Sequence, residues 1–285
     1  VKNKIILGTV QLGIPYGINN SLGKPSEEDA FQILDYAFNK DIRTLDSADG
    51  YGDALSVIGH YRTRSDRSFN IINKFKVDSS VIFEKLQKTL MILTEKSLYC
   101  YMYHHYPDYV SGKVRKELNE LRRIGVIQKI GVSLYEVDQL ARVIDDSDIS
   151  IIQLPVNLLD LNRDKIALLQ KAKLRGKEVH ARSVYLQGLF FKDPETLTGN
   201  LIPMRPYLDK IRMMSKNHSI DIKKAAINHI LQKDFIDYVV LGIDHVSQLV
   251  ENLTLIDSNL DTSMFEGLEV SSADAYLLNP ANWRL

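Results

Sequence analysis

Four residues that can exchange protons follow one another in the first part of the chain. Asp46 stands at the end of an apolar segment, and Tyr51 comes five residues after it. Lys74 and His104 end the next two apolar segments. A single apolar segment that ends in an ionisable residue is ordinary. Three such segments in succession would place a carboxylate, an ammonium and an imidazole together if they formed neighbouring strands. That cluster would suit acid–base chemistry.

The pattern around these residues indicates strands and helices that alternate along the chain. Short runs rich in apolar and β-branched residues predict strands at 5–9, 42–46, 69–74, 98–104, 129–133, 150–154, 178–183 and 238–242. Stretches with helical spacing of apolar residues predict helices at 26–39, 54–61, 81–93, 113–124, 136–144, 164–175, 207–217, 222–232 and 246–256. We expect Ser26 to cap the first helix, and Gly125 and Gly176 to end two others.

This alternation predicts an α/β fold, a (β/α)8 TIM barrel, with residues 1–285 as one domain. The alternative is a doubly wound sheet, but residues 8–13 lack its Gly-rich spacing and lead into no immediate helix in this reading. In a barrel, reactive groups lie at the carboxyl ends of the strands. The polar residues expected there are Asp46, Lys74, His104, Ser133, Gln153 and Ser183, with Tyr51 in the loop after the second strand.

The composition excludes several classes of protein. The 36 basic and 36 acidic residues give a net charge of zero, so no overall field attracts nucleic acid or an anionic membrane. A single cysteine, Cys100, allows no disulfide within the chain, and the histidines and this cysteine show no spacing typical of a metal site. Residues 1–6 lack the pattern of a secretory signal, and no apolar run reaches the ~20 residues of a membrane span. We therefore expect a soluble, cytoplasmic protein that binds a small molecule.

Several segments, in order along the chain, resemble motifs of the aldo-keto reductases. Residues 45–52, LDSADGYG, resemble the D-[ST]-A-x-x-Y-G motif, and Lys74 and His104 fall where that family carries its lysine and histidine. The resemblance continues through GVS at 131–133, IQLPVN at 152–157, ARSVYLQG at 181–188 and QLVEN at 248–252. The opening segment 8–17 and the short ending look like a bacterial branch of the family.

The resemblance implies a catalytic set of Asp46, Tyr51, Lys74 and His104. Reduction of a carbonyl needs a hydride, which a nicotinamide supplies because no side chain can, and a proton from a positioned acid. A free tyrosine is a weak acid at neutral pH, and the ammonium of Lys74 beside it would favour its phenolate. Asp46 would pair with Lys74, and His104 would orient the carbonyl.

Two adjacent histidines compete for the last of these roles. Successive strand residues face opposite sides, so Leu98, Cys100, Met102 and His104 share one face, and Tyr99, Tyr101, Tyr103 and His105 the other. The compact side chains suit a barrel interior better than three tyrosines, which favours His104. Pro107 permits the opposite reading, because some family members place a proline two residues after their histidine.

The resemblance also implies residues that bind the cofactor. They are Ser133 and Gln153 at the nicotinamide, Arg182, Ser183, Leu186 and Gly188 in the segment that follows, and Gly242, Gln248, Glu251 and Asn252 at the adenosine end. The family suggests NADP. However, residues 242–245, GIDH, offer no strong cation for its 2′-phosphate, and Asp244 would repel one, so NAD stays possible.

Two other kinds of barrel remain as alternatives to a reductase of an aldehyde or ketone. One is an isomerase or lyase that uses Lys74 and Asp46 without redox chemistry. The other is a redox-silent barrel that binds NAD(P)H as a sensor or subunit. The bacterial branch suggests a sugar-like carbonyl compound as the substrate, with Tyr16, Tyr185 and Trp283 as possible pocket residues.

Overall fold

A closed parallel barrel forms the centre of the molecule. The computed structural model describes residues 4–20, 22–78 and 81–284. The strands are β1 (Ile5–Gly8), β2 (Thr44–Ala48), β3 (Asn70–Phe75), β4 (Leu98–Tyr103), β5 (Ile127–Ser133), β6 (Ile151–Pro155), β7 (Glu178–Arg182) and β8 (Tyr238–Gly242). Each strand pairs with the next, and β8 closes onto β1. The predicted (β/α)8 barrel is confirmed, and the doubly wound sheet is excluded.

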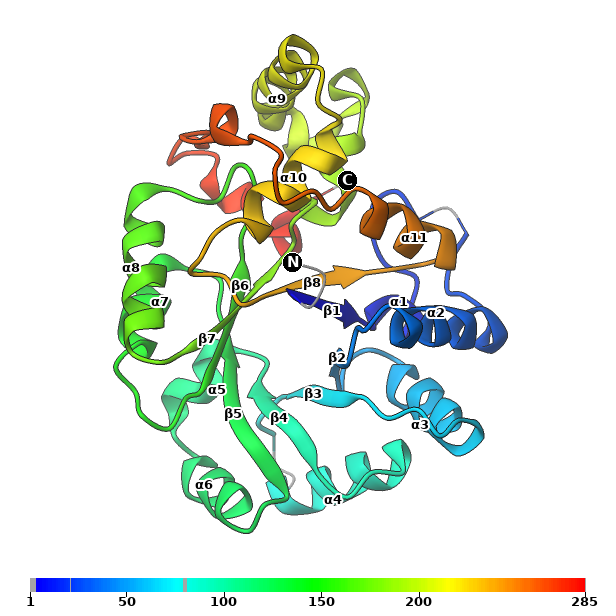
Figure 1. The fold of residues 1–285 in the computed structure, drawn as a ribbon. Coiled ribbons are helices and arrows are strands. Elements are labelled where there is room, and N and C mark those ends of the chain that lie inside the picture. The colour runs from blue at the N-terminus through cyan, green and yellow to red at the C-terminus, as the bar shows by residue number, and fades with distance from the viewer. Residues whose placement is uncertain (1–3, 21, 79–80, 285) are drawn as a thin grey trace.

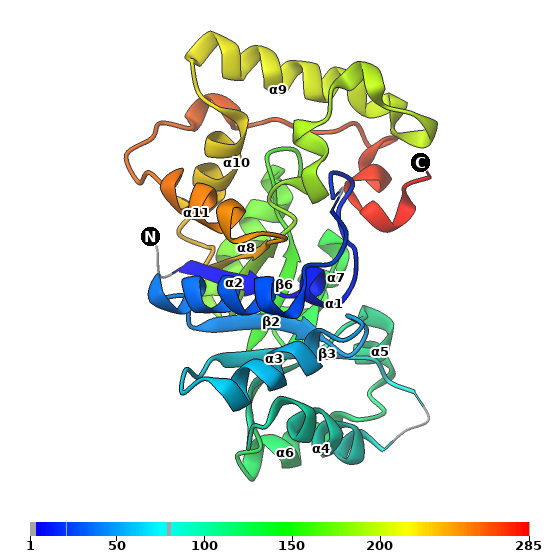
Figure 2. The same cartoon turned by 90° about the vertical axis from the view of Figure 1, so that its right-hand side faces the viewer.

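Helices cover the outside of the barrel. They are α1 (Val10–Gly13), α2 (Glu27–Asn39), α3 (Ala54–Arg64), α4 (Ile82–Leu93), α5 (Tyr106–Ser111), α6 (Arg115–Arg123), α7 (Val137–Val143), α8 (Arg163–Leu174), α9 (Arg205–His218), α10 (Ile222–Leu231) and α11 (Val246–Thr254). Figure 1 shows the strands surrounded by α2, α3, α4, α6 and α8, and Figure 2 shows α9 lying across one end of the molecule. Within the described residues, no helix combines the length and apolarity that crossing a membrane requires.

The expected helix ends are present. The Ser26 hydroxyl accepts a hydrogen bond from the backbone N–H of Asp29 at 3.1 Å, as an N-cap should. Gly125 and Gly176 follow α6 and α8 with φ of 78° and 72°, a left-handed conformation that costs glycine little. Residues 1–3, which contributed to the expectation about a secretory signal, lie outside the described residues.

Two apolar clusters hold the barrel together. A small one fills its interior and consists of Ile6, Ile72, Cys100, Met102 and Ile151. A much larger one lies between the strands and the helices. Gly131 on β5 makes the interior packing possible, because a Cβ there would lie 2.8 Å from Cε of Met102 and 3.0 Å from Sγ of Cys100.

Strand β4 follows the predicted alternation except at its beginning. Cys100 and Met102 point into the barrel, and Tyr101 and Tyr103 pack in the outer cluster, as expected. The prediction for the first two residues is wrong: Leu98 packs in the outer cluster, and Tyr99 packs against the interior one. Tyr99 is satisfied there because its hydroxyl reaches a group of charged side chains at the amino-terminal end of the barrel.

The segment after β1 also differs from the prediction. The expectation that no helix follows directly is wrong, because α1 begins at Val10. Its turn is closed by hydrogen bonds from the Leu12 N–H to the Thr9 carbonyl and from the Ile14 N–H to the Val10 carbonyl, each 3.0 Å. Four residues are too few to show a helical period in the sequence.

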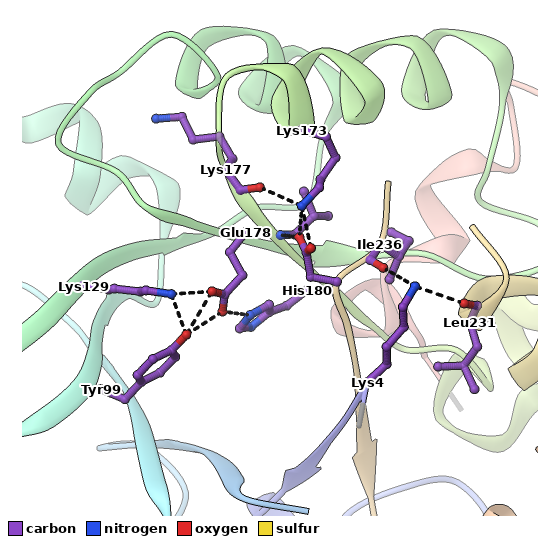
Figure 3. Close-up of polar contacts among 11 residues, drawn as sticks. Lys4, Tyr99, Lys129, Lys173, Lys177, Glu178, His180, Leu231 and Ile236 are labelled. Atoms are coloured by element: carbon purple, nitrogen blue, oxygen red, sulfur yellow. Dashed lines mark hydrogen bonds and ion pairs between the residues drawn. The ribbon is translucent and has the colours of Figure 1, made fainter. Parts of the chain in front are cut away.

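A polar cluster occupies the amino-terminal end of the barrel (Figure 3). Glu178 accepts hydrogen bonds from the Tyr99 hydroxyl at 2.9 and 3.1 Å, forms an ion pair with Lys129, and lies 2.7 Å from Nε2 of His180. Burial raises the pKa of Glu178, but the hydrogen bonds and charges of His180 and Lys129 outweigh it and hold the pKa at about 2. The carboxylate is therefore the shared acceptor of three side chains.

We expect Glu178→Gln to lower the free energy of unfolding by about 1–3 kcal/mol at pH 7, because it removes the charge that satisfies three neighbours. A carboxyl group whose pKa is lower in the folded state stabilises the fold above its unfolded pKa of about 4.3 and loses that effect as the pH falls toward 2. Urea unfolding of both proteins between pH 7 and pH 3 measures the difference, which should shrink with falling pH.

The exposed pair Glu120–Arg123 on α6 provides the control. Glu120→Gln should leave the unfolding midpoint unchanged, because exposed ion pairs contribute little. A Glu178→Gln protein as stable as this control at pH 7 would contradict the stabilising role of the cluster.

Candidate active site

A cavity of about 330 Å³ opens at the carboxyl ends of the strands. It is lined by Gly8, Thr9, Val10, Gln11, Tyr16, Asp46, Tyr51, Lys74, His104, Ser133, Tyr135, Arg182, Ser183, Val184, Tyr185, Gln187, Val240, Leu241 and Gly242. The four residues of the proposed catalytic set therefore share one cavity. They come from three neighbouring strands and the loops that follow them, whose carboxyl ends meet at one rim because the strands are parallel.

A buried ion pair forms the floor of the cavity. Nζ of Lys74 on β3 lies 2.5 Å from Oδ1 of Asp46 on β2, and each side chain is only 3% exposed. Gln153 on β6 binds both partners: its Oε1 accepts from Lys74 at 3.0 Å, and its Nε2 donates to Oδ2 of Asp46 at 2.7 Å. The second carboxylate oxygen is thus satisfied, as a buried charge requires.

The charge state of Lys74 follows from these contacts. Burial lowers the pKa of the ammonium, but the negative charge of Asp46 and the proximity of Tyr51 outweigh it, and the net pKa is raised. These contacts favour the ammonium form of Lys74. Its Nζ lies 5.2 Å from the centroid of the Tyr51 ring, so the positive charge faces the phenol.

The loop that carries Tyr51 is held by close backbone packing. The Tyr51 N–H donates to the Ala48 carbonyl at 3.1 Å, and its own carbonyl accepts from the Ala54 N–H at 3.1 Å, where α3 begins. Gly13 of α1 packs directly on this turn, since a Cβ there would lie 1.7 Å from the Tyr51 carbonyl oxygen. The short helix after β1 therefore fixes the position of the tyrosine.

His104 faces the cavity, and His105 stacks on it from behind. The His104 ring lies edge-on to Tyr51 with centroids 5.9 Å apart, and the two imidazoles stack at 4.8 Å. Burial, followed by the charge of Lys74, lowers the pKa of His104 to about 3, so the ring is neutral. Its Nδ1 is buried without a hydrogen-bond partner among the described residues. The cavity lining includes His104 and not His105.

The residues expected to bind a cofactor separate into two groups. Those that line the cavity are Ser133, Arg182, Ser183 and Gly242. The others lie outside its lining: Gln153, Leu186, Gly188, Gln248, Glu251 and Asn252. The side chains of four of the others bond to protein groups. Gln153 holds the ion pair, and Glu251 pairs with Lys223. Gln248 bonds to Asp244, and Asn252 accepts from the Tyr185 hydroxyl at 2.6 Å.

Several lining residues were not predicted as site residues. Gln11, Tyr135 and Gln187 line the cavity. Gln11 and Gln187 lie within the family-like segments 8–17 and 181–188 but were not predicted as site residues, and Tyr135 lies outside the motifs. Gln11 comes from the unexpected helix α1. Tyr16, which the sequence suggested as a pocket residue, accepts a hydrogen bond from Nε2 of Gln187 at 2.5 Å.

The segment after β7 curls over the cavity with an unusual backbone. Ser183, Leu186 and Gln187 have φ of 60°, 46° and 53°, and Gly188 has 92°. A non-glycine residue in this region costs about 1–3 kcal/mol, so such residues persist where surrounding contacts impose them, commonly at binding sites. Here the turn is closed by the Leu186 N–H donating to the Ser183 carbonyl at 2.8 Å.

Two features of the cavity suit a nicotinamide ring. Gly8 and Gly242 leave the wall beside β1 and β8 without side chains, and a Cβ on Gly242 would lie 2.3 Å from Nε2 of Gln11. Oε1 of Gln11 and Nδ1 of His104 are buried polar atoms without partners among the described residues. The amide of a nicotinamide could bond to Oε1 of Gln11, and the carbonyl oxygen of a substrate could bond to Nδ1 of His104.

Removal of one partner of the ion pair should be costly. We expect Asp46→Asn to destabilise the fold by about 3–5 kcal/mol, because it leaves the ammonium of Lys74 buried without a counter-charge. The double variant Asp46→Asn/Lys74→Met removes both charges and should be more stable than Asp46→Asn. Urea unfolding of the three proteins measures this order. A double variant less stable than the single one would contradict it.

Comparison with known proteins gives a family match and several similar folds. A model of the Aldo/keto reductase family matches residues 4–272. No curated protein sequence matches the chain. Among solved structures, an aldo-keto reductase from Bacillus halodurans in its holo form has a TM-score of 0.70 and 17% identity over 96% of this chain and 90% of that one. A putative aldo-keto reductase from Pseudomonas aeruginosa has a TM-score of 0.67 and 17% identity over 88% of each chain.

At 17% identity these structures establish the fold alone, and the family assignment rests on the sequence model. That model extends from the first strand of the barrel to the residues beyond its last helix, α11. The chain therefore belongs to the aldo/keto reductase family of oxidoreductases.

Proposed function

We propose that the protein reduces an aldehyde or ketone with a nicotinamide cofactor, and that Tyr51 supplies the proton. The observation that carries this proposal is the meeting of Tyr51, Lys74 and His104 in one cavity, with Lys74 held as a buried cation. The resemblance to family motifs suggests a sugar-like carbonyl compound as the substrate.

A bound nicotinamide would supply the hydride. Ser133, Arg182, Ser183 and Gly242 line the cavity where they could contact it, and the orphaned Oε1 of Gln11 could accept a hydrogen bond from its amide. The chain's own residues must then provide the proton and hold the carbonyl oxygen.

Tyr51 is the proton donor in this proposal. Tyr51 lines the cavity, and the ammonium of Lys74 faces its ring at 5.2 Å from the centroid. When the phenol gives its proton to the carbonyl oxygen, the positive charge stabilises the phenolate that remains. Because Asp46 and Gln153 hold the lysine, this charge is in place before the reaction and needs no reorganisation.

His104 orients the substrate. A neutral imidazole can donate one hydrogen bond, and Nδ1 has no protein partner among the described residues. With a pKa of about 3, the ring stays neutral throughout the physiological range and does not compete with Tyr51 as the acid. It can therefore direct the carbonyl oxygen without giving up a proton.

We expect Tyr51→Phe to lower kcat/KM for aldehyde reduction by at least about 100-fold, since a general acid contributes about 10²–10⁴-fold. The variant should bind reduced cofactor with a Kd within a few-fold of the wild-type value, measured by nicotinamide fluorescence. The control is Tyr276→Phe, which removes a hydroxyl from an exposed tyrosine outside the cavity lining. Full activity in Tyr51→Phe would show that another group is the acid.

The charges beside β8 favour a cofactor without a 2′-phosphate. Family resemblance places the adenosine end near residues 242–252, where it predicts NADP. However, Asp244 accepts hydrogen bonds from Asn20 and Gln248, each 3.3 Å, and has no lysine or arginine partner among the described residues. A carboxylate in this position repels a phosphate and suits ribose hydroxyls. We therefore propose NAD as the preferred form.

In the wild-type protein NADH should bind more tightly than NADPH. Asp244→Ser should shift the ratio of the two Kd values toward NADPH by about tenfold, because it removes a negative charge near the phosphate. Fluorescence titration with both cofactors measures the ratio, and Asp209→Ser on the exposed side of α9 is the matched control. A wild-type preference for NADPH that Asp244→Ser leaves unchanged would contradict this assignment.

A further inference from the structure

The cavity carries one positive charge that its own walls do not balance. Among its lining residues, Asp46, Lys74 and Arg182 are charged, and His104 is neutral. Asp46 and Lys74 neutralise each other at 2.5 Å. Arg182 makes no ion pair with a carboxylate of the described residues, so its charge is left to the cavity.

Arg182 is held in place by other means. Its guanidinium stacks on the ring of Tyr135 at 4.2 Å from the centroid. Nη2 donates to the Leu134 carbonyl at 3.1 Å, and Nη1 approaches the Ser183 hydroxyl at 3.5 Å. A guanidinium has five N–H donors, so these two contacts leave a preorganised group with donors to spare.

The nearby carboxylate is already occupied. Asp160, close enough to feel the field of Arg182, forms a buried ion pair at 2.7 Å with Lys165, which is 1% exposed. One arginine and one lysine lie near this carboxylate, and direct contact with it goes to the lysine. The charge of Glu136 also acts on Asp160 and Lys165, but Glu136 forms no ion pair with Arg182 among the described residues. Arg182 therefore faces the cavity, on the side that β5 and β7 form, without a direct counter-ion.

This charge faces the same cavity as the proposed proton donor, because Arg182, Tyr51 and His104 all line it. Burial and then the charge of Lys74 are the largest causes of the low pKa of His104, and Arg182 makes a smaller contribution in the same direction. The pKa of Tyr16 is raised by burial first and then by Tyr51, and it is lowered by the charge of Arg182. Tyr16 therefore lies within the electrostatic field of both Tyr51 and Arg182. An anion bound by Arg182 would therefore lie near the carbonyl that Tyr51 and His104 hold.

We propose that the substrate is an anionic carbonyl compound whose carboxylate or phosphate binds the guanidinium of Arg182 on Tyr135. This proposal rests on the proposed function, because it identifies the anion as part of the compound to be reduced. Planar guanidinium groups bind carboxylates and phosphates through paired hydrogen bonds, and such charged hydrogen bonds are about twice as strong as neutral ones. The other possible source of the same chemistry is the diphosphate of the cofactor.

The test compares compounds that differ in one charge. The first pair is 4-carboxybenzaldehyde and methyl 4-formylbenzoate, for which kcat/KM is measured. The second pair is the corresponding alcohols, 4-(hydroxymethyl)benzoate and its methyl ester, whose Kd values are measured by calorimetry with saturating NAD. The binding measurement reports on the anion site even when no reduction occurs.

We expect the acid to bind the wild-type protein at least about tenfold more tightly than the ester. Arg182→Met should bring this ratio to about one, and Arg182→Lys should restore part of it, because lysine keeps the charge and loses the planar fork. The control, Arg163→Met, removes an exposed arginine at the start of α8 and should keep the wild-type ratio. If Arg182→Met fails to fold, the wild-type ratio and Arg182→Lys still decide.

Three results would overturn the proposal. The first is equal binding of acid and ester by the wild-type protein. The second is a preference for the acid that both Arg182 variants retain. The third is an Arg182→Met protein that loses affinity for NADH and keeps the preference for the acid, which would assign the arginine to the cofactor's diphosphate. Selective binding of the acid without any reduction would support the anion site and contradict the reductase function. Equal reduction of both aldehydes would support the reductase function and contradict the anion site.

Discussion

The buried ion pair between Asp46 and Lys74 is the constraint on which the rest of the site depends. Two charges withdrawn from water are stable only if their attraction and additional hydrogen bonds offset the loss of hydration. Gln153 provides those bonds from β6, on the other side of the barrel. Three strands must therefore keep their relative register, and the packed interior of the barrel, including the gap left by Gly131, maintains it.

The Asp46–Lys74 pair also influences the charge states of the neighbouring groups in the cavity. As a unit it is neutral overall, yet it presents its positive end to Tyr51 and His104. The imidazole is neutral, which in the proposed mechanism leaves the phenol of Tyr51 as the proton donor. Arg182 is then the remaining formal charge of the lining, and its contacts are an aromatic ring, a carbonyl and a hydroxyl rather than a carboxylate.

The fold could be predicted because its signals are local. Apolar runs, the cap at Ser26 and the glycine stops at Gly125 and Gly176 each depend on a few neighbouring residues. Parallel strands also bring their carboxyl ends together, so Asp46, Lys74 and His104 could be expected at one rim. The role of Gln153 could not be predicted, because its partners Lys74 and Asp46 lie 79 and 107 residues away in the chain. Helix α1 was missed for the opposite reason, since four residues carry too little periodicity.

The two halves of the barrel divide the work of the site, and this division explains what the sequence reveals. The groups proposed to move the proton come from β2, β3 and the loops after β2 and β4, which follow one another along the chain. The groups proposed to recognise the substrate come from β5, β7 and their loops, where Tyr135 and Arg182 act as a stacked pair. Neither residue is informative alone, because an arginine acquires an unbalanced charge only through what surrounds it. Proton chemistry can therefore be recognised from residue types, whereas charge recognition requires the packed structure.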